Sequence, residues 1–208
     1  MFGFGKKKSE TRVIGALTDQ QLGDLDLILM VDNSGSMGAR SLRVAGSRLE
    51  EVQQHVMRTA ETAETFDSDG ITLIEFGSTA QLFDNVGALK VAGIFKQFNR
   101  SGSTNLTHGL ELAVAKATSS PKNVVVVCWT DGSPDSERTA KAVIDKAGKT
   151  LGRPKVGFTF VQVGEEPSAS KFLDSLDNDM KVDVCATVRA DAASELSIHQ
   201  LAWLAQNA

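Results

Sequence analysis

The sequence lacks tyrosine altogether, and aromatic residues make up only 6% of its 208 residues. Proteins that bind single-stranded nucleic acid stack its bases on aromatic side chains, and such a surface is hard to build from this composition. The formal net charge of −4 gives no electrostatic attraction to nucleic acid either. We therefore expect no nucleic acid partner.

Long apolar runs are also missing, and none approaches the roughly 20 residues that a helix needs to cross a bilayer. Lys6, Lys7 and Lys8 near the N-terminus are not followed by an apolar segment, so this region does not resemble a secretory signal. Three lysines are fewer than the roughly four to eight of lipid-binding clusters, which favours a solvated tail over a lipid contact. The only cysteines, Cys128 and Cys185, lie inside apolar runs, which favours buried reduced thiols. We expect a cytoplasmic protein.

What the sequence does contain is an alternation of short apolar runs with longer amphipathic ones. Leu25–Val31 and Val124–Trp129 are almost continuously apolar, which is typical of strands buried on both faces. Apolar residues at three- and four-residue spacing from Leu42 to Ala63 predict one face of a long helix. The same patterns predict strands at Ile71–Phe76, Gln81–Val86, Val156–Val163 and Val182–Val188, and helices at Leu89–Phe98, Leu106–Ala117, Ser136–Ala147, Lys171–Leu176 and Ala192–Ala205.

Strands that alternate with helices predict an α/β fold with a doubly wound, Rossmann-like, mostly parallel sheet covered by helices on both faces. Gln81–Val86 follows Ile71–Phe76 across Gly77-Ser78, so we expect one antiparallel edge strand. The length suits one sizeable domain. We assign residues 1–22 to a flexible N-terminal tail and residues 23–208 to the domain.

Oxygen-bearing side chains follow two of the buried strands at the point where each strand ends. Asp32, Ser34 and Ser36 follow the first strand, and Asp131 follows Val124–Trp129. The carboxyl ends of parallel strands meet at one edge of a sheet, so we expect these side chains to converge there with Thr104 from a nearby loop. Hard oxygen ligands without His or Cys suit Mg²⁺, with Mn²⁺ or Ca²⁺ as alternatives.

The charges of these candidate ligands suggest a role in recognition. Three of them are neutral hydroxyls, so at most the two carboxylates of Asp32 and Asp131 balance a divalent cation. Such a metal stays electrophilic and should recruit a carboxylate or another anion from outside. The alternative is purely structural, with both aspartates capping turns and helix N-termini through hydrogen bonds.

The same residues resemble the metal-ion-dependent adhesion site (MIDAS) of von Willebrand factor type A (VWA) domains. The resemblance covers the chain from about Asp24 to its end, and each motif position carries the expected residue type in the expected order. Two departures leave the ligand positions unchanged: Ser103 stands where a second glycine is common, and Trp129 is bulkier than the usual aliphatic residue. The matching motif segments are Asp32-x-Ser34-x-Ser36, Gly102-Ser103-Thr104-Asn105-Leu106 and Thr130-Asp131-Gly132-Ser133-Pro134-Asp135.

The resemblance implies hydroxyl ligation of the metal by Ser34, Ser36 and Thr104. Asp32 and Asp131 would hold the metal directly or through waters, and an Asp or Glu of a partner protein would take the open position. Within the family, the segments 160–164 and 171–177 resemble an intracellular branch that includes copine-type domains and bacterial domains associated with tellurite resistance.

We therefore predict a non-enzymatic, divalent-cation-dependent protein-binding module. The alternative is a metal-dependent hydrolase or phosphotransferase that acts on a small anionic substrate. Phosphoryl-transfer enzymes with a strand-end aspartate nucleophile typically place a second aspartate two residues later, where this chain has Ser34, and no general acid is evident. The P-loop motif is missing, and the dinucleotide-binding glycine motif does not follow the first strand. Arg40, Arg100 and Asp135 either flank the site and tune the anion that it accepts, or are ordinary loop charges. We expect His108 to be a packing or solvent-facing residue.

Overall fold

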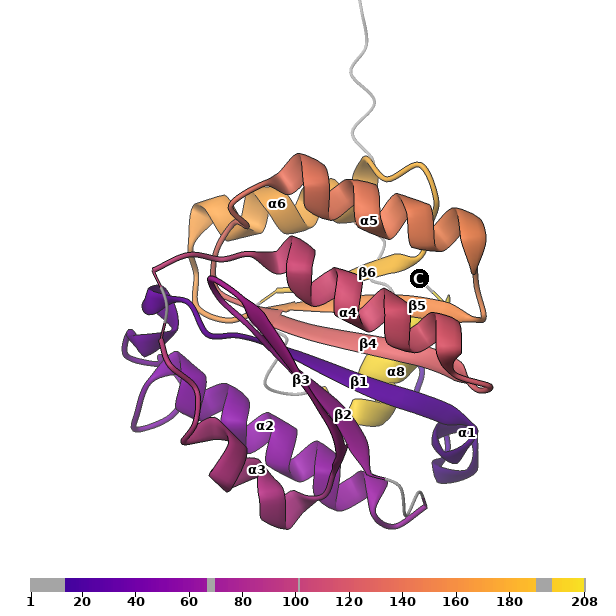
Figure 1. The fold of residues 1–208 in the computed structure, drawn as a ribbon, viewed down its shortest axis with the longest axis horizontal. Helices are drawn as coiled ribbons and strands as arrows, with labels where there is room; N and C mark the ends of the chain where they lie inside the picture. The colour runs from indigo at the N-terminus through magenta and orange to yellow at the C-terminus, as the bar shows by residue number, and fades with distance from the viewer. Residues whose placement is uncertain (1–13, 67–69, 101, 190–195, 208) are drawn as a thin grey trace, which may run out of the picture.

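The computed structural model describes residues 14–66, 70–100, 102–189 and 196–207. A six-stranded sheet with the order β3-β2-β1-β4-β5-β6 forms the centre of the molecule (Figure 1). All neighbouring strands are parallel except β2 and β3, which pair antiparallel across a short turn. The predicted α/β class and its antiparallel edge strand are therefore confirmed. The strands are β1 (Leu25–Asp32), β2 (Ile71–Phe76), β3 (Ala80–Val86), β4 (Asn123–Thr130), β5 (Val156–Gln162) and β6 (Cys185–Val188).

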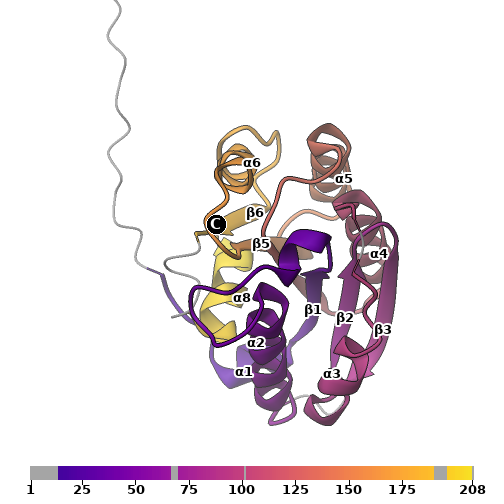
Figure 2. The same cartoon turned by 90° about the vertical axis from the view of Figure 1, so that its left-hand side faces the viewer.

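Helices cover both faces of this sheet (Figures 1 and 2). On one face α1 (Asp19–Gly23), α2 (Arg48–Ala63), α3 (Ala88–Phe95) and α8 (Ile198–Asn207) bury apolar residues, and on the other face α4 (Leu106–Ser119), α5 (Glu137–Thr150) and α6 (Pro167–Asn178) do so. A single 3-10 turn, η1 (Gly35–Gly38), follows β1.

The two central strands have hydrophobic neighbours on both faces. Along β1, Leu29 and Val31 join the core on the α2 side, whereas Ile28 and Met30 join the core on the α4 side. Successive side chains of a strand point to opposite faces, so the middle of a strand covered on both faces is expected to be apolar at successive positions. This explains the continuous apolar runs. The packing on both faces also holds the ends of β1 and β4 in place within the sheet.

The helix α2 begins later than the sequence pattern predicts. Leu42 is 74% exposed and lies in the loop before the helix, so its place on a helical face was wrong. The helix starts after Ser47, whose hydroxyl accepts a hydrogen bond from the Glu50 N–H while the Glu50 side chain accepts from the Ser47 N–H. This capping box satisfies free N–H groups at the helix start, which the apolar spacing alone does not reveal.

The segment 14–22, which we assigned to the tail, packs against the domain. Leu22 is fully buried, and the Leu17 N–H donates to the His199 carbonyl at 3.1 Å. Residues 1–13, including the three lysines, lie outside the described residues, as does the predicted start of the last helix at Ala192. For residues 1–13 the tail stays a prediction.

Two smaller observations bear on the sequence analysis. Cys128 and Cys185 are buried free thiols, as predicted. Among the described residues, no helix is both long enough and apolar enough to span a membrane.

Candidate metal centre

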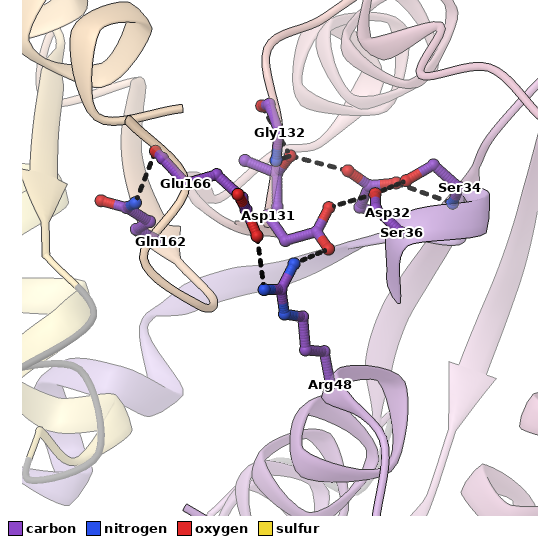
Figure 3. A network of polar contacts seen from close by, with 9 residues as sticks. Asp32, Ser34, Ser36, Arg48, Asp131, Gly132, Gln162 and Glu166 are labelled. Carbon is purple, nitrogen blue, oxygen red and sulfur yellow. Dashed lines mark hydrogen bonds and ion pairs between the residues drawn. The ribbon is translucent and has the colours of Figure 1, made fainter. Parts of the chain in front are cut away.

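The candidate site lies where β1 and β4 end side by side. Val31 of β1 pairs with Trp129 of β4, so Asp32 at the end of β1 and Asp131 just after β4 reach the same edge of the sheet. Both aspartates are 0% exposed. The two aspartates therefore lie at the same edge of the sheet and are linked to each other through Ser34 and Ser36 (Figure 3).

The Asp32 carboxylate accepts hydrogen bonds from uncharged groups. Its Oδ1 accepts from the Ser34 N–H at 2.8 Å, and its Oδ2 accepts from the Thr130 hydroxyl at 2.7 Å. Burial raises the pKa of Asp32 to about 6, although the hydrogen bonds from Thr130 and Ser34 oppose the rise. Burial makes the ionised form of this carboxylate unfavourable, and a cation placed close to it would stabilise that ionised form.

The two serines of the motif face each other next to Asp131. The turn η1 brings the Ser34 and Ser36 Oγ atoms to 3.1 Å, and the Ser36 hydroxyl donates to the Asp131 Oδ1 at 2.7 Å. A hydroxyl that donates its proton to a carboxylate keeps its lone pairs for another partner. Ser36 is exposed and Ser34 is buried, so the cluster opens to solvent on one side.

Thr104 lies on the loop before α4, which is hydrogen-bonded to the loop that follows Asp131. Its N–H donates to the Asp135 Oδ1 at 2.9 Å, and its carbonyl accepts from the Asp135 N–H at 3.0 Å. Asp135 therefore ties the Thr104 loop to the β4 end of the site. Of the five predicted ligands, four are joined by direct hydrogen bonds, and Thr104 is bonded through its backbone to Asp135, four residues after Asp131.

Sequence reasoning missed Arg48 and Glu166. The Arg48 Nη1 donates to the Asp131 Oδ2 at 2.7 Å, and its Nη2 donates to the Glu166 Oε1 at 2.6 Å (Figure 3). Burial lowers the pKa of Arg48, but the hydrogen bonds and charges of both carboxylates outweigh burial and raise it. Arg48 is the first residue of α2, so recognising the Ser47–Glu50 capping box would have placed it at a helix start. Glu166 follows β5, and the same rule about strand ends would have pointed to it.

The donor set suits a hard divalent cation. Adjacent oxygens around Mg²⁺ at about 2.1 Å from the metal lie about 3.0 Å apart, which matches the 3.1 Å between the Ser34 and Ser36 Oγ atoms. In the described part of the chain no three His, Cys, Asp or Glu side chains gather as a metal-binding group. A metal here would therefore depend on hydroxyl ligands beside the two aspartates.

Comparison with known proteins identifies the family of this fold. The family model described as the von Willebrand factor type A domain matches residues 27–133, just over half of the chain. A search of curated protein sequences found no match. The pilus adhesin SpaC from Lactobacillus rhamnosus GG superposes with a TM-score of 0.59 and 16% identity, over 82% of this chain and 29% of that one.

Two further solved structures share the fold at low identity. Manganese-loaded TRAP protein from Plasmodium vivax has a TM-score of 0.58 and 18% identity, over 87% of this chain and 73% of that one. A mutant of the PilB minor pilin from Streptococcus sanguinis has a TM-score of 0.55 and 14% identity, over 88% of this chain and 63% of that one. The chain therefore spans less than two thirds of the pilin and of the adhesin. The family match and the fold together show that the chain belongs to the von Willebrand factor type A domain family.

Proposed function

We propose that this chain is a protein-binding module whose grip on an acidic partner depends on a divalent cation, Mg²⁺ in the first place. Asp32, Ser34, Ser36, Thr104 and Asp131 form the site that would hold it. The observation that carries the proposal is the buried pair of aspartates joined to two facing serine hydroxyls at one sheet edge. The names of the similar structures, a pilus adhesin and a manganese-loaded protein, agree with adhesion and with metal binding.

Each residue has a distinct task in this proposal. Ser34, Ser36 and Thr104 offer neutral hydroxyl oxygens to the cation. Asp131 accepts a hydrogen bond from the Ser36 hydroxyl at 2.7 Å, so the lone pairs of the Ser36 oxygen point away from Asp131. Asp32 fixes the start of the loop by accepting the Ser34 N–H. When bound, the metal supplies an electrophilic position for a carboxylate.

The partner in this proposal is a protein that presents an Asp or Glu side chain. With two carboxylates and three hydroxyls, the protein ligands at most balance the dication, so an additional anion gains from its field. The exposure of Ser36 gives such a side chain a path from solvent. We propose binding without catalysis, because the two carboxylates at the site are the proposed metal ligands and the remaining charged group in contact with them, Arg48, is a poor general base.

We further propose that the chain acts in the cytoplasm, within the intracellular branch of the family. The two buried free thiols and the resemblance of the segments 160–164 and 171–177 to that branch support this assignment. Immunodetection of the tagged protein in cell fractions tests the compartment.

Isothermal titration with Mg²⁺ and Mn²⁺ tests the metal site. The wild-type protein should bind one cation saturably, and the Ser34→Ala/Ser36→Ala variant should lose this binding while it stays folded. A matched control is Ser119→Ala/Ser175→Ala, which removes two hydroxyls that donate only to carbonyls of their own helices. No binding by the wild-type protein at millimolar metal, with or without added glutarate as a carboxylate probe, rejects the proposal. Capture of a protein partner in Mg²⁺ but not in EDTA, lost in the double variant, would extend it to recognition.

A further inference from the structure

Arg48 is a built-in cation of the candidate metal centre. Its side chain is 12% exposed, and its two terminal nitrogens bridge the Asp131 Oδ2 at 2.7 Å and the Glu166 Oε1 at 2.6 Å. The other oxygen of Asp131 accepts the Ser36 hydroxyl. Asp131 therefore stands between the hydroxyl cluster on one side and the guanidinium on the other (Figure 3).

The loop after β5 is shaped around this guanidinium. Gly164 has a φ of +70°, and a Cβ atom at this position would lie 2.6 Å from the Arg48 Cζ, closer than real side chains approach. Gln162 donates from its Nε2 to the Glu166 carbonyl at 3.3 Å and so ties the loop back to the strand. The protein thus gives Arg48 a fitted place.

The charges at this position change what a metal would experience. Asp32 and Asp131 carry two negative charges, and Arg48 cancels one of them by direct contact. A divalent cation added to this site leaves one net positive charge, whereas without Arg48 the two carboxylates balance the cation. Glu166 is 46% exposed, so water screens its charge and it offsets only part of this excess.

We infer that Arg48 competes with the metal for Asp131, so that the site binds a divalent cation firmly only together with an anionic ligand. Arg48 in this role is a specificity-determining residue: it weakens binding of the metal alone and strengthens the coupling between the metal and a carboxylate. The inference rests on the proposed function, because it assigns a task within the same site.

The Arg48→Gln variant tests this, with Arg58→Gln as the matched control. Arg58 lies on the same helix, and its Nε donates to the Gln54 carbonyl of that helix, so the control makes the same change of charge away from the site. Titration with Mn²⁺ alone should show about tenfold tighter binding to Arg48→Gln than to the wild-type protein or the control. Addition of glutarate should tighten Mn²⁺ binding to the wild-type protein, and this gain should shrink in Arg48→Gln.

A second readout separates this role from simple structural support. In EDTA the Arg48→Gln variant should unfold at a lower temperature than the wild-type protein, because Asp131 stays buried without its counter-ion. Replacing a residue that merely supports the fold would lower both the stability of the protein and its affinity for the metal. Arg48 should lower stability and raise metal affinity when it is replaced.

The outcomes distinguish this inference from the function on which it rests. If the wild-type protein binds Mn²⁺ and Arg48→Gln binds it no more tightly, the inference fails while the metal site stands. If, even with glutarate present, Arg48→Gln binds Mn²⁺ and the wild-type protein does not, the competition is supported and metal dependence of the wild-type protein is refuted. Binding by neither protein refutes both. If Arg48→Gln does not fold, the Glu166→Gln variant serves as the test instead, because Glu166 is half-exposed. This variant loses a negative charge beside Arg48, so Mn²⁺ should bind to it more weakly than to the wild-type protein. Unchanged or tighter binding overturns the inference.

Discussion

Replacing Asp32 by Asn should stabilise the metal-free protein while it abolishes metal binding. Asp32 is fully buried, and the groups that hold it are the Ser34 N–H and the Thr130 hydroxyl, neither of which carries a charge. An Asn side chain keeps an oxygen for the Ser34 N–H, and its amide can donate to the Thr130 hydroxyl. The substitution therefore removes a buried charge and retains the hydrogen bonds.

The size of the effect follows from the pKa of Asp32. Burial raises this pKa from 3.8 to about 6, and each pKa unit corresponds to about 1.4 kcal/mol. Ionised Asp32 at neutral pH therefore costs the folded state about 3 kcal/mol relative to the unfolded chain. The folded protein holds the proton of the Asp32 carboxyl group more tightly than the unfolded chain does. The stability associated with the protonated form of Asp32 is therefore fully present below about pH 4. It is lost as the pH rises through about 6.

Denaturant unfolding in EDTA measures this contribution directly. At pH 7.5, Asp32→Asn should raise the free energy of unfolding by about 3 kcal/mol, and the gain should approach zero near pH 4. The exposed Asp179→Asn substitution is the control and should change stability by less than about 0.5 kcal/mol. Added Mg²⁺ should stabilise the wild-type protein and leave Asp32→Asn unchanged. Loss of stability in Asp32→Asn at neutral pH, or a gain independent of pH, would refute the reasoning.

Three further substitutions test a close backbone approach, a buried histidine and a helix cap elsewhere in the fold. Gly157→Ala should destabilise the protein by about 3 kcal/mol or more, because its Cβ would collide with the Ala205 carbonyl of α8; Gly93→Ala, which meets nothing within 4 Å, should be neutral or stabilising in thermal unfolding. Burial first, and the Arg58 charge second, lowers the pKa of His55, so its contribution to stability is present above about pH 6.5 and is lost as the pH falls. The stability of His55→Gln should therefore decline less than that of the wild-type protein between pH 7.5 and pH 5, and an equal decline would contradict this assignment. Ser47→Ala removes the capping box of α2 and should cost about 1 kcal/mol in denaturant unfolding.

The fold was predictable because its central strands signal themselves in the sequence. The strands β1 and β4 lie between layers of helices, so the interior runs Leu27–Val31 and Val124–Trp129 are continuously apolar and stand out from any amphipathic pattern. The start of α2 was harder to place, because Leu42 continues the apolar spacing although its side chain is 74% exposed. Spacing records where apolar residues recur, whereas the capping box at Ser47 decides where the helix begins.

The candidate site was predictable to the extent that it depends on strand ends. Asp32 and Asp131 follow directly from the rule that parallel strands present their carboxyl ends at one edge. The contact between Arg48 and Asp131 spans 83 positions of sequence and depends on how α2 packs beside the sheet, which no local pattern records. Charge complementarity alone does not identify such a pair, because the chain has 22 basic and 26 acidic residues.

The positions of the acidic and hydroxyl groups divide the site into a fixed part and an adjustable part. The carboxylates of Asp32 and Asp131 are anchored at the ends of β1 and β4, which pair along seven residues and are packed on both faces. Ser36 and Thr104 lie on loops held by a few hydrogen bonds, from Ser36 to Asp131 and between Thr104 and Asp135. Reorienting a loop side chain costs far less than shifting a central strand, since the strand would break its ladder and its packing together. The hydroxyls can therefore adjust to a cation and its ligand, while the buried carboxylates and the fitted Arg48 set the charge that the cation meets.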